Sequence, residues 1–354
     1  QPEDICLVRS TTEALALVYQ AMPLQPGDEV LCTTHDHYSH HESIRMAVER
    51  AGATMRRVAL YEDPAEASID EMVGRLRAAI AKLNPQVPLA AREDALKQVV
   101  DLGVPVQLSA NRLFHRLLVG GVPVQYQKEG ETRGDFVRLI DWTNVRSNDW
   151  LAVNQFSIQG PKHTRRPDII LFVNGLPLAV LELKNPTDEN ATMERAHNQL
   201  QNYKNKVAEL FRFNVALVIS DGMEARIGSL TAGLDRFQPW RTIDGEKHDD
   251  LGRAELEVLI KGAFDPARLL DLAFDYTAFE MADGVVKSKK LAGYHQFHAV
   301  RRALTSTVKA ASEGGHRKGG VVWHTQGSGK SLTMLFYVRQ LQLAKKLKNP
   351  TIVV

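Results

Sequence analysis

The stretch over residues 166–186 constrains the fold most, because it places two acids and a lysine on two short apolar runs joined by a turn. Asp168 opens the first run, and Asn174-Gly175 is the commonest signal for a two-residue β-hairpin turn. The second run ends in Glu182-Leu183-Lys184, whose first and third side chains share one face of a strand. Because a charged pair on an apolar strand is costly when it is buried without partners, we expect it at a solvent-facing sheet end or in contact with a ligand.

A metal ion shared by Asp168 and Glu182 would restrict the register of this hairpin. Directly opposed residues of antiparallel strands share a face, and a regular two-residue turn would place Asp168 opposite Leu181 instead. One additional residue restores the pair, and either a three-residue loop over residues 174–176 or a β-bulge further along supplies it. We predict one of these two arrangements, with the carboxylates about 4–6 Å apart so that one ion with ligand bonds of roughly 2.1 Å bridges them.

The following segment, Thr192 to Phe211, repeats apolar and polar residues at helical spacing and places Gln199 and Tyr203 on one face. Each signal alone has a plain structural interpretation, namely solvated edge residues for E-x-K and a surface glutamine with a half-buried tyrosine for the helix. In this order, however, an acid, E-x-K and Q-x-x-x-Y resemble the PD-(D/E)xK nucleases of the RecB-like branch. The longer strings RRPDIILFVNGLPLAVLELKNP, ENAT, NQLQNYK, ALVISDGMEARIGSLT and PWRTIDGE look like the R (HsdR, restriction) subunit of type I restriction-modification enzymes.

The resemblance implies a Mg²⁺ site in which Asp168, Glu182 and the carbonyl of Leu183 hold the ion. Lys184 would orient or deprotonate the attacking water and meet the charge that develops on the phosphate. The implied substrate is double-stranded DNA, while a separate S subunit would supply sequence specificity and an M subunit would supply methylation.

The resemblance also gives roles to the helix, in which Gln199 and Tyr203 would support the lysine or touch DNA. Some PD-(D/E)xK nucleases take a further carboxylate from their first helix, but the helical pattern from Leu108 to Val119 contains no acid. The basic run from Lys162 to Arg166 directly precedes the first acid, and a solvated turn and a contact to backbone phosphates explain it equally well.

A glycine-rich motif late in the chain indicates nucleotide binding. Residues 319–331, GGVVWHTQGSGKS, predict a strand, a phosphate loop and the start of a helix. Lys330 would reach the β- and γ-phosphates of ATP, and Ser331 would reach Mg²⁺. His324 replaces the glycine of a strict Walker A motif, a departure that superfamily 2 helicases tolerate and that R subunits share.

Upstream, Tyr294-His295-Gln296 resembles the adenine-recognising segment of that family, although a polar helix cap is an alternative interpretation. The predicted ATP-binding residues are Gln296, Gly327, Ser328, Gly329, Lys330 and Ser331.

The composition is that of a globular protein, with 44% hydrophobic and 24% charged residues in a chain of 354. This length predicts two or three domains. The net charge of +2 gives no general affinity for nucleic acid, so DNA contacts must come from local patches. Cys6 and Cys32 show no metal-ligand spacing, and no apolar run approaches the roughly 18 to 20 residues that a membrane helix needs. We therefore expect a protein of the reducing cytoplasm without a membrane segment.

Residues 1–78 have a different character. The strings STTEALALV, LQPGDEVLCTTHDHYSHHES, ERAGATMRRVAL and IDEMVGRLRAAI resemble class V PLP-dependent aminotransferases. By that resemblance Thr12 would meet the cofactor phosphate at a helix N-terminus, and a histidine near His37 would lie over the pyridine ring. The Schiff-base lysine and the ring-nitrogen aspartate of that family are missing, so we expect no aminotransferase activity. The histidines at positions 35, 37, 40 and 41 lack an acid or cysteine at ligand spacing, which favours a solvated loop over a metal site.

Between Arg77 and Lys82 the resemblance changes from the aminotransferase to the R subunit, which indicates a fusion or an error of assembly or gene model. The chain begins without methionine and ends at Val354 inside an apolar strand. We therefore expect an internal piece of a longer protein, with an incomplete ATPase part.

The predicted fold is α/β in three parts. Residues 1–78 form a partial aminotransferase-like segment, and residues 79–264 form a PD-(D/E)xK restriction-endonuclease-like mixed sheet with flanking helices. Residues 265–354 form linker helices and the start of a RecA-like P-loop helicase lobe. Within the middle part, apolar spacing predicts helices over residues 88–100 and 108–119, a hairpin of residues 122–127 with 136–142, and a strand over residues 149–158.

The predicted function is that of a restriction subunit fragment that cuts double-stranded DNA with Mg²⁺, coupled in the full-length protein to ATP-dependent DNA translocation. Two alternatives stay open. One is a fragment that holds DNA or ATP without turnover, and the other is a PLP-dependent aminotransferase-like protein.

Overall fold

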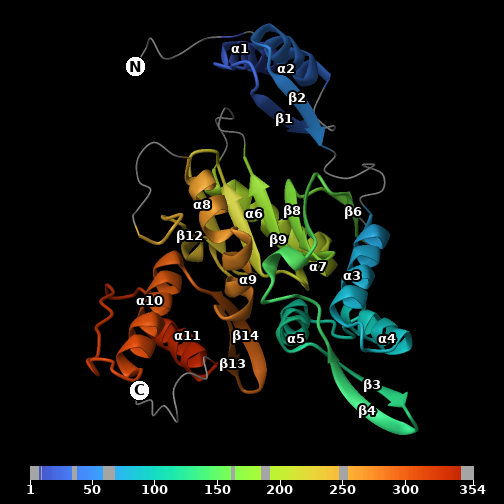
Figure 1. Cartoon of the computed structure of the whole chain (residues 1–354), viewed down its shortest axis with the longest axis vertical. Coiled ribbons are helices and arrows are strands. Elements are labelled where there is room, and N and C mark those ends of the chain that lie inside the picture. The colour runs from blue at the N-terminus through green and yellow to red at the C-terminus, as the bar shows by residue number, and fades with distance from the viewer. Residues whose placement is uncertain are drawn as a thin grey trace. The chain divides into compact units, whose positions relative to one another are not determined.

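The computed structural model describes residues 8, 10–33, 38–58, 68–160, 164–184, 192–246 and 254–343. Contacts divide the chain into two compact units, Gln1–Ala67 and Ser68–Val354 (Figure 1). This division lies ahead of the boundary at 78/79 that the sequence suggested, and none falls at 264/265. Among the described residues, no helix is both long and apolar enough to cross a membrane.

The first unit is a small α/β arrangement. Its elements are α1 (Thr11–Ala21), β1 (Glu29–Thr33), α2 (Tyr38–Ala51) and β2 (Thr54–Val58), and the two strands pair in parallel. Ser10 caps α1 by accepting a hydrogen bond from the Glu13 N–H, and Thr12 lies exposed in the first turn. A small hydrophobic cluster is formed by Cys32, Ile44 and Val48.

The histidine-rich stretch differs from the predicted solvated loop. Because α2 begins at Tyr38, His40 and His41 lie in a helix. His41 is buried, with its Nε2 atom 2.7 Å from the carbonyl oxygen of Thr33. The histidines at positions 35 and 37 lie outside the described residues.

The second unit is built on the predicted mixed sheet with flanking helices. Its six strands follow the order β12-β11-β10-β9-β8-β5, in which only β9 and β10 pair in parallel. A parallel pair needs a crossover, and helix α6 supplies it by packing on both strands. The elements are β5 (Trp150–Asn154), β8 (Ile169–Val173), β9 (Leu176–Leu183), α6 (Met193–Lys206), α7 (Ala208–Phe211), β10 (Ala216–Ser220), β11 (Ala225–Gly228) and β12 (Gln238–Pro239).

The β8–β9 hairpin contains the predicted extra residue as a bulge. Asn174 and Gly175 form a two-residue turn with positive φ angles of 52° and 77°, as a turn of this length favours. The pairing then shifts between Leu171 and Phe172, so that Leu171 pairs with Ala179. The bulge is therefore confirmed, and the alternative three-residue loop is wrong.

Helix α3 (Ile69–Leu83) fixes this turn in place. A Cβ atom at Gly175 would lie 2.1 Å from the carbonyl oxygen of Met72, so only glycine permits the helix to pack this closely. The side chain of Asn174 is buried and accepts a hydrogen bond from the Asp149 N–H at 2.7 Å. This packing places α3 in the second unit, although its sequence belongs to the aminotransferase-like string.

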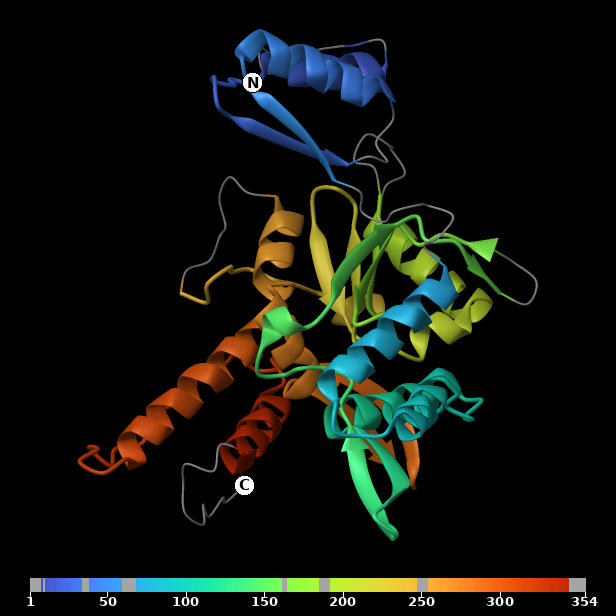
Figure 2. The same ribbon diagram turned by 45° about the vertical axis from the view of Figure 1, so that its right-hand side comes forward.

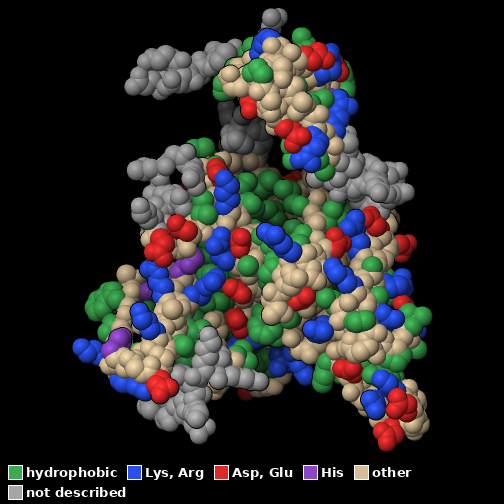
Figure 3. All heavy atoms as spheres, in the orientation of Figure 1, with side chains coloured by type: hydrophobic (Ala, Val, Ile, Leu, Met, Phe, Trp, Pro, Cys, Tyr) green, Lys and Arg blue, Asp and Glu red, His purple; other side chains and the backbone are tan. Residues whose placement is uncertain are grey.

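The helices α4 (Leu89–Val100) and α5 (Gln107–Gly120) agree with the predicted ranges. The hairpin after them does not, because Glu129-Gly130 forms a two-residue turn between β3 (Val122–Lys128) and β4 (Glu131–Val137). The predicted strand over residues 136–142 is therefore wrong. Figure 2 shows this hairpin projecting as a ribbon, and Figure 3 shows charged side chains of both signs at its tip.

The predicted strand over residues 149–158 is interrupted. β5 ends at Asn154, Gln155 adopts a left-handed conformation with φ 53°, and the chain continues into a separate small hairpin. Phe156 is buried against Phe172, which takes the chain out of the line of β5. The hairpin consists of β6 (Ile158–Gln159) and β7 (Thr164–Arg165).

The C-terminal elements share the core of the sheet. Leu259, Tyr276, Phe297 and Phe336 belong to the same buried hydrophobic cluster as Leu178, which explains why the unit does not divide at 264/265. The elements are α8 (Glu255–Ala263), α9 (Pro266–Phe274), β13 (Thr277–Ala282), β14 (Val285–Leu291), α10 (Tyr294–Ala311) and α11 (Lys330–Leu343), with short 3-10 turns at Val145–Ser147 and Leu234–Arg236.

The strand predicted before the phosphate loop is not formed. Residues 315–325 carry no strand pairing, and Val321 and Trp323 are each 88% exposed. A strand needs a neighbour to satisfy its backbone groups, and no described strand lies alongside this segment.

Candidate metal-binding and phosphate-binding sites

The bulged hairpin brings Asp168 and Glu182 to the same face of the sheet. Ile169 pairs with Leu181, so Asp168, one residue before β8, is level with Glu182 near the end of β9. Glu182 is only 2% exposed, whereas Asp168 is partly exposed. One acid therefore lies in the interior and the other faces solvent.

Both carboxylate oxygens of Asp168 accept hydrogen bonds from uncharged donors. Oδ2 accepts from the backbone N–H of Leu183 at 2.8 Å, and Oδ1 accepts from the side-chain amide of Gln155 at 2.9 Å. Because a carboxylate offers about four lone-pair positions, both oxygens keep capacity for a cation.

Glu182 has a different environment. Its Oε1 lies 2.5 Å from the ammonium of Lys184, and its Oε2 is buried and accepts no hydrogen bond. Burial raises the pKa of Glu182 to about 7; the hydrogen bond from Lys184 opposes this shift, and the negative charge of Asp168 adds to it. A buried oxygen without a donor is costly unless something else satisfies it.

These residues fit a small hard cation. The orphaned Oε2 of Glu182 and the facing carboxylate of Asp168 are oxygen ligands of the kind that Mg²⁺ prefers. Within the described ranges, no group of three or more His, Cys, Asp or Glu side chains could hold a metal ion. A pair of carboxylates suits Mg²⁺, which keeps several waters, better than Zn²⁺, which takes a full protein ligand set in structural sites.

Helix α6 carries Gln199 and Tyr203 to the same place. Thr192 caps the helix by accepting from the Arg195 N–H, and Tyr203 is buried with its hydroxyl donating to the Arg166 carbonyl at 3.2 Å. Burial raises the pKa of Tyr203 to about 12; Gln199 opposes this shift, and the nearby carboxylates add to it. The structure thus groups the five predicted residues, namely Asp168, Glu182, Lys184, Gln199 and Tyr203.

The basic run before Asp168 is described only in part. Arg166 donates from Nε to the Ser157 hydroxyl at 2.8 Å, and its carbonyl accepts from Tyr203. Residues 161–163 lie outside the described residues.

Gln155 is the residue at this site that sequence reasoning missed. It belongs to no motif, and the sequence offers only a weak signal, namely two consecutive polar residues, Asn154 and Gln155, directly after the apolar run from Trp150 to Val153. Its contact with Asp168 depends on the left-handed backbone that ends β5.

The glycine-rich loop leads into a helix, as predicted, although the strand expected before it is not formed. Gly327 and Gly329 have φ angles of 80° and 79°, and α11 begins at Lys330, so the free N–H groups of a helix N-terminus follow the loop. The Lys330 ammonium is exposed and donates to the Thr325 carbonyl at 3.2 Å, and Ser331 is exposed.

Gln296 connects α10 to this loop. Its Oε1 accepts from the Gly293 N–H at 3.0 Å, which is the helix-cap alternative, and its Nε2 donates to the Gly329 carbonyl at 3.1 Å. Its neighbour His295 has a ring nitrogen 3.1 Å from the Ser328 carbonyl oxygen.

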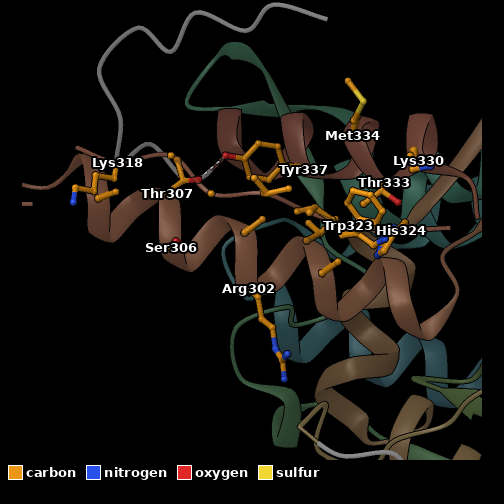
Figure 4. Close-up of a pocket in the computed structure, with 18 of the residues that line it drawn as sticks. Arg302, Ser306, Thr307, Lys318, Trp323, His324, Lys330, Thr333, Met334 and Tyr337 are labelled. Atoms are coloured by element: carbon orange, nitrogen blue, oxygen red, sulfur yellow. Dashed lines mark hydrogen bonds between the residues drawn. The ribbon is translucent and has the colours of Figure 1, made fainter. Parts of the chain in front are cut away.

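Beside the loop lies an open cavity of about 910 Å³ between α10 and α11 (Figure 4). Trp323, His324 and Lys330 line its loop side. The hydroxyl groups of Thr307 on α10 and Tyr337 on α11 form a hydrogen bond of 2.7 Å between the two helices.

Comparisons with known proteins identify the family of the chain. A family model described as type I restriction enzyme R protein N terminus matches residues 38–236, and a SWI2/SNF2 ATPase model matches residues 295–354. The chain is 46% identical over 290 residues to the type I restriction enzyme HindI endonuclease subunit of Haemophilus influenzae, covering 80% of the chain and 27% of that protein. It is 31% identical over 297 residues to the putative type I restriction enzyme MjaIXP endonuclease subunit of Methanocaldococcus jannaschii, covering 78% and 28%.

The chain thus spans about a quarter of the length of these relatives. The comparisons give no support to the aminotransferase resemblance of residues 1–78, and the match to the first family model begins inside that segment, at residue 38.

Proposed function

Because the chain belongs to the family described as type I restriction enzyme R protein N terminus, we propose that the site at Asp168, Glu182 and Lys184 cuts double-stranded DNA in a Mg²⁺-dependent reaction. The observation that carries this proposal is the buried Oε2 of Glu182, which accepts no hydrogen bond and lies on the same face as Asp168. The names of the relatives, which are endonuclease subunits, support it.

In this proposal Asp168 and Glu182 hold Mg²⁺ together with the carbonyl of Leu183. The bound ion would polarise the phosphate and lower the pKa of a coordinated water. Lys184 has three N–H donors and uses one for Glu182, so it keeps donors for the attacking water or a phosphate oxygen. Gln199 and Tyr203 would support this arrangement from α6, because the Tyr203 hydroxyl donates a hydrogen bond to the carbonyl of Arg166, two residues before Asp168.

The second half of the proposal concerns ATP. The loop Gly327-Ser328-Gly329 with Lys330 and Ser331 would bind the phosphates and Mg²⁺, and Gln296 would contact the adenine. The match to the SWI2/SNF2 ATPase model supports this assignment. By likeness to its relatives, the complete protein would use ATP to translocate DNA and would work with M and S subunits.

The nuclease half can be tested by plasmid nicking. The chain is incubated with supercoiled DNA and Mg²⁺, and the variants Asp168→Asn, Glu182→Gln and Lys184→Ala are compared with it. We expect each variant to lose activity by about 100-fold or more, since each removes a ligand or a charge that acts at the reacting phosphate.

The exposed pair of Glu280 and Lys290, 3.3 Å apart on the β13–β14 hairpin, provides a matched control. The variants Glu280→Gln and Lys290→Ala should nick at the unmodified rate. Nicking by the Glu182→Gln variant at that same rate would end the assignment.

A further inference from the structure

We propose that Gln155 is a positioning residue that fixes the carboxylate of Asp168 for the metal ion; this inference rests on the function proposed above. Gln155 makes two hydrogen bonds to Asp168. Its backbone N–H donates to the Asp168 carbonyl at 2.9 Å, and its side-chain amide donates to Oδ1 at 2.9 Å. One residue therefore fixes both the backbone and the side chain of the acid.

The backbone hydrogen bond from Gln155 to Asp168 extends the pairing of β5 with β8 by one residue. Asn154 pairs with Ile169 at the end of the β5–β8 ladder, so Gln155 lies level with Asp168. Directly opposed residues point to the same face, which brings the amide of Gln155 to the carboxylate.

The backbone of Gln155 is strained in a way that no turn explains. Gln155 has φ 53°, a conformation that residues with a side chain rarely adopt. Of the four other described non-glycine residues with positive φ, three open a two-residue hairpin turn and precede a glycine, namely Glu129, Asn174 and Asp283. The fourth, Arg317, lies in the loop after α10. Gln155 precedes Phe156 and lies in no such turn. Strain of this kind is retained where a specific geometry is needed.

The contact also leaves the charge of Asp168 available. Leu183 holds Oδ2 and Gln155 holds Oδ1, so two uncharged donors fix the plane of the carboxylate. Glu182, in contrast, is paired with the ammonium of Lys184. An amide at Gln155 orients the carboxylate without competing, as a cation would, for the position of the metal ion.

If Gln155 served only to end β5, the loss of its side-chain amide would not affect metal binding. Glycine at this position keeps the backbone N–H and relieves the left-handed strain, so Gln155→Gly should leave the fold at least as stable. The same change removes the amide that holds Oδ1. Stability and metal binding should therefore separate in this variant.

The test is a titration of the chain with Mn²⁺, in which free Mn²⁺ is measured by electron paramagnetic resonance. We expect Gln155→Gly to weaken binding about tenfold while its unfolding temperature stays the same or rises. The half-saturating Mg²⁺ concentration for plasmid nicking should rise by a similar factor, with the rate at saturation nearly unchanged.

Glu129→Gly provides the matched control, because Glu129 has φ 56° in an exposed turn of the β3–β4 hairpin. It should gain stability in the same way and bind Mn²⁺ like the unmodified chain. If Gln155→Gly does not fold, Gln155→Asn replaces it, since Asn tolerates the left-handed conformation and is one methylene shorter. We expect the same weakening from Gln155→Asn.

Unchanged Mn²⁺ affinity in the folded Gln155 variant, whether Gln155→Gly or its replacement Gln155→Asn, would overturn the inference. Failure of the proposed function has a separate signature, because the folded unmodified chain would then bind no Mn²⁺ at this site at all.

Discussion

Asp168 lies opposite Glu182 because the pairing of β8 with β9 shifts by one residue between Leu171 and Phe172. Without the shift, Asp168 would face Leu181 and Glu182 would point to the other side of the sheet. The bulge is therefore the structural condition for a shared metal site. It coexists with a regular two-residue turn at Asn174-Gly175.

A pair of cysteines tests this register. In the double variant Asp168→Cys with Glu182→Cys, the Cβ atoms of opposed residues should be close enough for a disulfide under mild oxidation. The control pair, Asp168→Cys with Leu181→Cys, should not form one, because these side chains point to opposite faces. Mass spectrometry of the cross-linked peptide measures the outcome. Efficient cross-linking of the control pair alone would mean that the regular register is present.

The packing of α3 on the turn predicts unequal effects of alanine at two similar glycines. Gly175→Ala places a Cβ atom 2.1 Å from the Met72 carbonyl oxygen, whereas Gly130→Ala has nothing within 4 Å. Both glycines have positive φ angles, 77° and 84°, so the backbone strain is similar. We expect Gly130→Ala to lower the free energy of unfolding by about 1 kcal/mol and Gly175→Ala by several kcal/mol.

Urea unfolding measures this difference. Equal destabilisation by the two substitutions would contradict the close contact between α3 and the turn, and with it the assignment of α3 to the second unit.

Sequence patterns predicted the elements whose signals are local. The helix expected over residues 108–119 is α5, Gln107–Gly120, because its apolar period is long and regular. The bulge was predicted from a functional requirement, since the turn signal alone favours the regular register. The grouping of Gln199 and Tyr203 with the acids followed from the resemblance and from helical spacing.

Features that depend on distant contacts were missed. The strand expected between Gly319 and the phosphate loop has no described neighbour to pair with, and apolar residues alone do not supply one. Gln155 was missed because its contact with Asp168 requires a left-handed backbone next to a buried Phe156. One local feature was also misplaced: the hairpin strand expected over residues 136–142 is Glu131–Val137, because a tight Glu129-Gly130 turn and not a longer loop joins the two strands.

Lys289 gives a pH-dependent prediction. This residue of β14 is buried and its ammonium donates to the carbonyl of Asn214, just before β10; burial lowers its pKa to about 7. An unfolded lysine has a pKa near 10.4, so between about pH 7 and 10 the unfolded state binds a proton that the native state does not. The stability contribution of this group therefore rises with pH in that window, by up to roughly 1.4 kcal/mol per pH unit, and is constant below it.

Urea unfolding of the unmodified chain and of Lys289→Met at pH 7, 8 and 9 measures this effect. The difference in unfolding free energy between them should shift in favour of the unmodified chain as the pH rises. Parallel pH profiles would show that Lys289 keeps its charge in the folded chain.

The shared metal site is tested most directly by anomalous diffraction from crystals of the chain grown with Mn²⁺, which accepts the same oxygen ligands as Mg²⁺. We expect one peak bonded to Oε2 of Glu182 and to an oxygen of Asp168, at about 2.1 Å from each, and no peak there in Glu182→Gln crystals. A Glu182 Oε2 atom that contacts only protein donors, with no peak beside it at saturating Mn²⁺, would contradict the central claim.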